Sequence, residues 1–182
     1  MKNEKIQIIE ASTILGLRPT GLEMMPKRLM EEGLQKLAEK NRIIKIKDMN
    51  YLYTTLRDKS GIINSETIIE FSKLLKKELK KTLGKGLFPL IIGGDCSILL
   101  GIMPALKEIA ESGLITFDAH SDYYMGFESE TGEAADMDIA IITGKGPEYL
   151  TNIDNMKPYV REEHVIHIGQ RDEEEVKEYN AS

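Results

Sequence analysis

Hydrophobic positions along the chain alternate between short apolar runs and longer stretches with helical spacing. Apolar residues recurring every three or four positions predict amphipathic helices at 24–39, 65–83 and 97–110. Short apolar runs predict strands at 5–10, 42–46, 87–92, 114–117 and 165–169. Further helices are expected at 134–142 and 172–179. This alternation of strands and helices favours a mainly parallel sheet with helices on both faces, a three-layer α/β/α architecture.

Individual residues predict where several of these elements begin or bend. Ser65 is expected to cap the second long helix and Asp172 the final one, because both side chains accept hydrogen bonds from free backbone N–H groups. Pro104 is expected to kink the third long helix. Residues 121–133 are polar and acidic, which predicts a loop. Because no repeat or linker interrupts the pattern, we expect residues 1–182 to form a single domain.

Ligands of parallel α/β folds bind beyond the carboxyl ends of the strands, so the segment after the fourth predicted strand is a candidate site. It reads D-A-H-S-D and carries Asp118, His120 and Asp122. On an extended segment, alternate side chains point the same way, so we expect these three to converge. Two carboxylates and an imidazole suit a cation such as Mn²⁺, Zn²⁺ or Fe²⁺. Spacing alone leaves open a solvated acidic loop with an incidental histidine.

The segment after the third predicted strand, G-G-D-C-S, is the second candidate. Gly93 and Gly94 allow a sharp turn from strand to helix, and Asp95 and Ser97 are both candidate caps. A phosphate site at this helix start is an alternative, but the spacing is not G-x-G-x-x-G and Asp95 would repel a phosphate. Cys96 is either a thiolate ligand for a metal or a small buried hydrophobic residue.

Composition narrows the classes of protein. The sequence has 24 Lys and Arg against 30 Asp and Glu, a net charge of −6, which argues against nucleic acid as a partner. A single cysteine excludes an intrachain disulfide framework and fits a reducing compartment, so we expect a cytoplasmic protein. No apolar run approaches the ~20 residues that span a bilayer, and we expect no membrane partner.

The two candidate segments together resemble a known family. G-G-D-C-S at 93–97 and D-A-H-S-D at 118–122 are similar, in order and separation, to the signatures of the ureohydrolases, the arginase, agmatinase and formiminoglutamase family. L-R-P-T-G-L-E-M-M-P-K-R-L at 17–29 and H-V-I-H-I-G-Q-R-D at 164–172 extend the resemblance. It implies an arginase-like α/β/α fold and hydrolysis of a linear C–N bond in a small cationic guanidino or amidine compound. Members use a hydroxide that bridges two Mn²⁺ ions, and they usually form oligomers.

The resemblance also implies roles for single residues. Asp118 would bridge both metal ions, His120 would bind one of them and Asp122 the other, which makes Asp118 and His120 the catalytic candidates. Tyr124 and Thr131 follow in the region where contacts with substrate are expected. Five acidic residues in this region either attract a cationic substrate or form ordinary solvated surface: Glu128, Glu130, Glu133, Asp136 and Asp138.

Three departures from the family pattern leave a second hypothesis open. Cys96 replaces a metal-binding histidine, so the site either prefers softer ions such as Zn²⁺ or Fe²⁺ or is weakened. Residues 132–138 lack the family's proton-transfer histidine. The sequence given ends before the family's S-x-D-x-D-x-x-D-P segment. We therefore expect a sheet without the family's C-terminal strands, with an open edge that favours oligomers. The alternative is a catalytically inactive or incomplete arginase-fold protein.

Overall fold

The computed structural model describes residues 5–39, 42–49 and 53–179, and it contains all five predicted strands. Strands β1 (Ile6–Ala11), β2 (Ile43–Lys45) and β3 (Phe88–Gly93) form a parallel sheet in the order β2-β1-β3. Strands β4 (Leu114–Phe117) and β5 (Val165–Ile168) form a second parallel sheet. Within the described residues no hydrogen-bonded ladder joins β3 to β4, so the predicted sheet is present as two parts.

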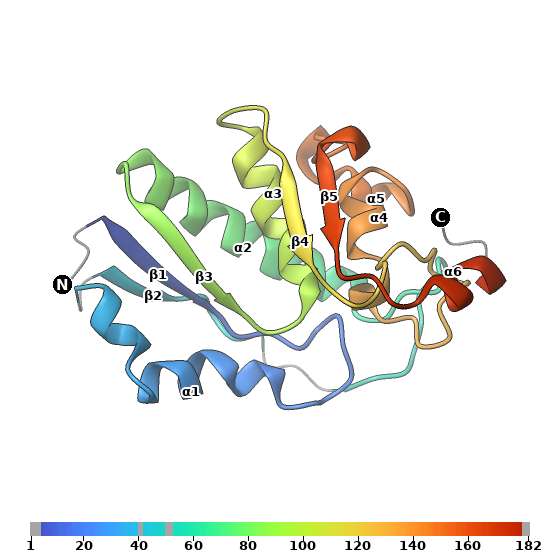
Figure 1. Cartoon of the computed structure of the whole chain (residues 1–182), viewed down its shortest axis with the longest axis horizontal. Coiled ribbons are helices and arrows are strands. Elements are labelled where there is room, and N and C mark those ends of the chain that lie inside the picture. Colours follow the sequence, from blue (N-terminus) through green and yellow to red (C-terminus); the bar gives the residue numbers. More distant parts are fainter. Residues whose placement is uncertain (1–4, 40–41, 50–52, 180–182) are drawn as a thin grey trace.

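Helices cover both faces of the first sheet, as the alternating pattern predicted. Helix α1 lies on one side of the sheet, whereas α2 and α3 lie together on the other (Figure 1). The arrangement therefore confirms the three-layer α/β/α class. The helices have these bounds: α1 Met25–Glu31, α2 Ser65–Gly84, α3 Leu99–Lys107, α4 Asp138–Ile142, α5 Glu148–Thr151 and α6 Glu173–Tyr179.

The helix predicted at 24–39 is interrupted. Helix α1 ends at Glu31, and a separate 3-10 turn covers Leu34–Leu37. Between them, Gly33 has a φ of 110°, a left-handed conformation that ends an α-helix and that glycine adopts without strain. The apolar spacing continues through this glycine, which is why the pattern alone predicted one helix.

The predicted cap of α2 is wrong, and Asp172 directly precedes α6 as predicted but uses its side chain elsewhere. Asn64, rather than Ser65, occupies the cap position of α2, and the Ser65 hydroxyl donates instead to Asp58 at 2.7 Å. The Asp172 carboxylate accepts from the backbone N–H of Ser121 at 2.7 Å and thereby ties the loop after β4 to the segment before α6. Both polar side chains therefore bond to residues outside the helices that they were expected to cap. Pro104 lies inside α3, which continues past it to Lys107.

One continuous hydrophobic core joins the two sheets and their helices. Its central side chains come from β1, from the inner face of α2, from α3 and from α4. The largest fully buried members include Ile9, Leu75, Leu79, Met103 and Ile141. This shared core holds the ends of β3 and β4 in fixed relation although their strands are not paired.

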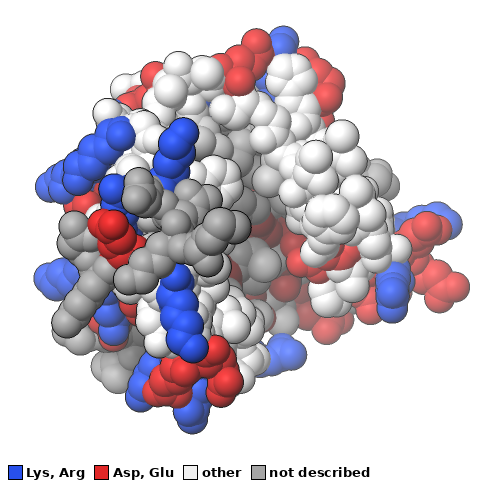
Figure 2. Space-filling view, turned by 60° about the vertical axis from the view of Figure 1, so that its left-hand side comes forward, with Lys and Arg blue, Asp and Glu red and all other residues white. Residues whose placement is uncertain are grey.

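One face of the β4–β5 sheet is apolar and uncovered. Ile115 stands opposite Ile166, and Phe117, whose surface is 77% exposed, stands opposite Ile168. Figure 2 shows, on the right of the molecule, a broad surface free of Lys, Arg, Asp and Glu, with charged side chains at its margins. Exposed apolar side chains that lie together, as these four do, mark an interaction face in many proteins. Separately, none of the helices in the described part of the chain combines the length and apolarity needed to cross a membrane.

Candidate metal centre

The turn that ends β3 sets the position of Cys96. A Cβ atom on Gly94 would lie 1.6 Å from the carbonyl oxygen of Thr13, so only glycine fits at this point. Asp95 then caps the following 3-10 turn, because its carboxylate accepts from the backbone N–H of Ser97 at 2.9 Å. Cys96 begins that turn, directly beyond the carboxyl end of β3, where the sequence predicted a ligand site.

The segment after β4 does not continue as an extended strand. The backbone N–H of Asp118 donates to Ile168 of β5 at 3.1 Å, and His167 places Nε2 3.2 Å from the Asp118 carbonyl oxygen. The chain then bends at 119–120, and Asp122 adopts a left-handed φ of 51°. The simple alternation of side chains expected for 118–122 is therefore not observed.

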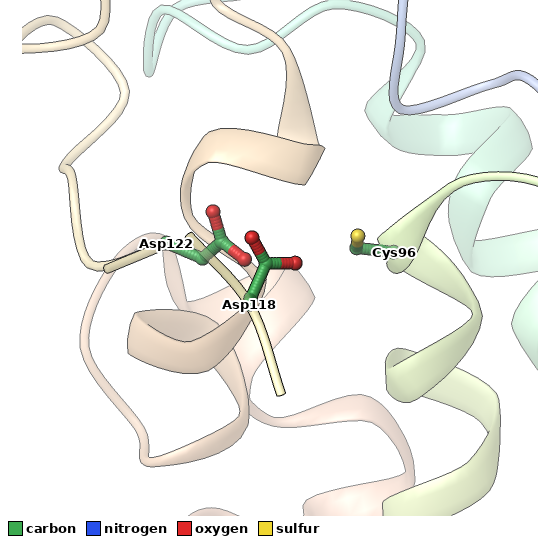
Figure 3. A group of neighbouring side chains, drawn as sticks. All are labelled: Cys96, Asp118 and Asp122. Atoms are coloured by element: carbon green, nitrogen blue, oxygen red, sulfur yellow. The ribbon is translucent and has the colours of Figure 1, made fainter. Parts of the chain in front are cut away.

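The two carboxylates of this segment nevertheless meet. Cys96, Asp118 and Asp122 each offer one ligand atom, and these atoms all lie within 4.8 Å of one another. In Figure 3 the carboxylates of Asp118 and Asp122 lie side by side, and Cys96 stands across from them at the start of a different helical segment. Asp122 is buried, and the other two are half-buried. A thiolate and two carboxylates are donors that divalent transition-metal ions accept.

His120 is placed differently from the two acids. Its side chain is 71% exposed, and Nδ1 lies 3.6 Å from Oδ1 of Asp118, whose carboxylate also accepts from the His120 backbone N–H at 3.0 Å. The bend at 119–120 turns the imidazole toward solvent. The structure thus brings together two of the three motif side chains and leaves the histidine beside Asp118 at the surface.

Burial and like charges dominate the electrostatics of this cluster. Burial, followed by the charges of Asp118, Asp136 and Asp172, raises the pKa of Asp122 to about 8. Burial and four neighbouring carboxylates likewise raise the pKa of the Cys96 thiol well above its ordinary value. Negative groups packed this closely must hold protons or a cation. The donor set and its electrostatics therefore fit a bound divalent cation.

The predicted substrate residues lie beside this cluster. A cleft of about 500 Å³ is lined by His120, Asp122, Tyr124 and Thr131 together with several acids. Thr131 donates from its hydroxyl to Asp136 at 2.5 Å, which holds that wall of the cleft in place. The acids along the cleft include Glu128, Glu130, Asp136, Asp172, Glu175 and Glu178. Arg18 also lines the cleft, but the acids outnumber it, so the cleft is suited to a small cationic molecule.

Two buried acids next to the cluster were not predicted as part of it. Asp95 and Asp138 are each 1% exposed, and each has one carboxylate oxygen without a hydrogen-bond partner. Asp95 was expected only as a cap, and Asp138 only as one of the loop acids. The helix predicted at 134–142 is a 3-10 turn followed by α4, and Asp138 is the first residue of α4. The one sequence feature that set Asp138 apart was its position directly before the apolar run 139–142.

Fold and cluster together define an α/β protein with a candidate cation site beyond the carboxyl ends of its parallel strands. Comparison with known proteins identifies its family. The Arginase family model matches residues 8–182, and the chain belongs to this family.

Curated relatives and solved structures agree with this family. The chain is 30% identical over 179 residues to an arginase of Staphylococcus aureus (strain COL), and 31% identical over 175 residues to an arginase of Brevibacillus brevis. The alignments cover 94% and 93% of this chain but only 58% of each relative, so the chain spans little more than half of their length.

Solved arginases share the fold. The Bacillus caldovelox arginase superposes with a TM-score of 0.83 at 26% identity, covering 99% of this chain and 64% of that one. The Entamoeba histolytica arginase, solved in complex with L-ornithine, superposes with a TM-score of 0.78 at 24% identity, covering 100% of this chain and 65% of that one. The arginase fold inferred from the sequence is therefore confirmed.

Proposed function

We propose that this chain supplies a divalent-cation site to a ureohydrolase that hydrolyses a linear C–N bond in a guanidino or amidine compound, such as an arginine- or agmatine-like molecule. The observation that carries the proposal is the convergence of Cys96, Asp118 and Asp122 within 4.8 Å at the ends of β3 and β4. Membership of the arginase family supports the reaction class.

Cys96, Asp118 and Asp122 would hold the cation, with His120 as a further ligand beside Asp118. Two Mn²⁺ ions per site are the family expectation, but a thiol among the ligands shifts the preference toward Zn²⁺ or Fe²⁺. When bound, such cations lower the pKa of a water molecule and hold it beside the substrate.

The chain's own residues would bind and orient the substrate. Acidic side chains along the cleft would attract a guanidinium or amidinium group, and Tyr124 and Thr131 would contact it from the cleft wall. His120 lines the same cleft and would bind the cation through its imidazole, beside Asp118. Asp118 and His120 are accordingly the proposed catalytic pair.

A catalytically inactive arginase-fold protein with a weakened metal site is the second candidate function. It is favoured by Cys96 in place of the family's histidine and by the exposed position of His120. Residues 132–138, which carry no histidine, support it further.

We also propose that the protein is cytoplasmic and works as a homo-oligomer, without a nucleic-acid or membrane partner. The uncovered apolar face of β4 and β5 supports self-association, because four large side chains there are exposed to water. The negative net charge supports the absence of nucleic acid.

Metal content and turnover together separate the two candidates. The purified protein is loaded with Mn²⁺, Zn²⁺ or Fe²⁺ and assayed for urea release over a panel of guanidino and amidine compounds. Catalysis predicts tightly bound metal and turnover of at least one compound, both lost in Asp118→Asn. Bound metal far below one ion per chain, with no turnover of any compound, would instead support the inactive protein.

A further inference from the structure

Asp138 combines deep burial with an unmet hydrogen-bonding need. It is the first residue of α4, it is 1% exposed, and its Oδ1 atom has no hydrogen-bond partner. A buried carboxylate with one unpaired oxygen is costly, because that oxygen has lost its water and gained no partner in exchange. A bound proton or a nearby cation would offset this cost.

Backbone hydrogen bonds hold Asp138 close to the metal cluster. The N–H groups of Ile139 and Ala140, the next two residues of α4, donate to the carbonyl oxygen of Asp122 at 3.1 and 3.3 Å. The first turn of α4 is therefore fastened to one of the candidate ligands. Since this contact uses the main chain alone, side-chain substitutions at 138 leave it in place.

Charge interactions agree that Asp138 faces the cluster. Among the carboxylates that raise the pKa of Cys96, Asp138 acts most strongly, ahead of Asp122, Asp118 and Asp95. After burial, the charge of Asp122 is the largest cause that raises the pKa of Asp138 itself. Such effects act between groups that are close in a protein interior, so Asp138 borders the cluster, just outside the three side chains whose ligand atoms lie within 4.8 Å of one another.

We propose that Asp138 is an additional carboxylate ligand of the cation held by Cys96, Asp118 and Asp122, entering the site from its buried side at the start of α4. This inference rests on the proposed cation site and adds a ligand to it. A hard oxygen donor here offsets the loss of the imidazole that Cys96 replaces. It makes the site more negative than three ligands alone would, which strengthens the hold on a divalent ion.

Asp138→Asn tests the proposal, with Asp136→Asn as the matched control. Asp136 undergoes the same chemical change and its charge also acts on Asp122, but its carboxylate is already bonded to Ser129 at 2.6 Å and Thr131 at 2.5 Å. The readout is Co²⁺ and Zn²⁺ affinity by calorimetry. We expect Asp138→Asn to weaken binding by about 10-fold or more, since losing a residue that only supports the ligands already costs about 10–100-fold in affinity. Asp136→Asn should change it much less.

The unfolding midpoint of the metal-free protein provides an independent readout. Replacing a buried carboxyl group that has one unpaired oxygen by an amide of the same shape should leave the metal-free midpoint of Asp138→Asn equal to or above that of wild type. Weaker binding would then not reflect poor folding. Equal affinity of wild type and Asp138→Asn would overturn the role of Asp138 alone. A wild-type protein that binds neither ion would overturn the underlying cation site as well.

Asp138→Cys keeps the proposal testable if the asparagine variant fails to fold. A thiolate at a ligand position adds a second sulfur-to-Co²⁺ charge-transfer band to that of Cys96, because thiolates bind such ions readily. We expect the band intensity per bound Co²⁺ to rise about twofold relative to wild type. An unchanged band would show that position 138 does not reach the ion.

Discussion

Cys96 and Asp118 place a thiol sulfur and a carboxylate oxygen within 4.8 Å of each other, although the strands that precede them share no hydrogen bond in the described structure. Cys96 follows β3 in one sheet, and Asp118 follows β4 in the other. A cation held by both would therefore link the two sheets as well as its own ligands.

Asp118→Ala should remove bound metal more completely than Cys96→Ala. Asp118 is proposed to bridge the ions, by its resemblance to a family ligand, and it accepts the His120 backbone N–H, whereas Cys96 replaces the histidine that the family motif has there. Metal content measured by mass spectrometry after dialysis checks this order. Glu148→Ala, at an exposed surface ion pair with Lys157, is the control and should retain wild-type content. Unchanged metal in Asp118→Ala would refute the assignment.

Cys96→His should raise Mn²⁺ occupancy and lower the relative preference for Zn²⁺. An imidazole suits Mn²⁺ better than a thiolate does, and it is the family's usual ligand at this position. Competition between the two ions, followed by metal analysis of both proteins, measures the preference. The same Zn²⁺/Mn²⁺ ratio in both would mean that position 96 does not contact the ion.

Asp58→Asn should lower the free energy of unfolding by about 1–3 kcal/mol near neutral pH, since its charged carboxylate collects several hydrogen bonds. Burial alone would raise the pKa of Asp58, but bonds from Tyr149, Ser65 and the backbone outweigh it and lower the pKa to about 2. A lowered pKa stabilises the fold above the unfolded-state value of 3.8. The difference from wild type should therefore shrink as pH falls from about 4 to 2.

Urea denaturation at several pH values measures this dependence. Tyr149→Phe is the matched control, because it removes one of the bonds to Asp58 and should cost less than Asp58→Asn. A destabilisation by Asp58→Asn that stays constant down to pH 2 would contradict the assigned cause.

The double substitution Ile115→Thr and Ile166→Thr should shift the protein toward monomer. These residues face each other across β4 and β5 and are both exposed on the uncovered apolar face. Sedimentation at several protein concentrations measures the shift. Leu56→Ser, at an apolar residue that is 81% exposed elsewhere, should leave association unchanged. If the double variant associates as wild type does, this face is not the interface.

Local patterns were sufficient to predict most of the fold. The five strands, α2 and α3 follow from apolar spacing and glycine positions, because these elements bury a face that the sequence displays. The break at Gly33 and the partners of Ser65 and Asp172 depend on backbone conformation and distant residues, which no local pattern contains. The absence of a ladder between β3 and β4 in the described structure likewise depends on distant packing, which no local pattern contains.

The candidate site was also predictable only as far as local sequence patterns reach. Cys96, Asp118 and Asp122 were predicted because each follows an apolar run with the pattern of a strand, and the structure brings them together. His120 was expected to join them, but the bend at 119–120 turns it to the surface. Asp138 lies sixteen positions after Asp122 along the chain and borders the cluster only because α4 packs against Asp122.

X-ray absorption at the zinc edge of the Zn²⁺-loaded protein tests the central claim most directly. If Cys96 binds the ion together with carboxylates, the spectrum contains a sulfur scatterer at about 2.3 Å and oxygen or nitrogen scatterers at about 2.0–2.2 Å. The sulfur contribution disappears in Cys96→Ser. Failure of the protein to retain Zn²⁺, or a wild-type spectrum with oxygen and nitrogen scatterers alone, would contradict the proposed centre.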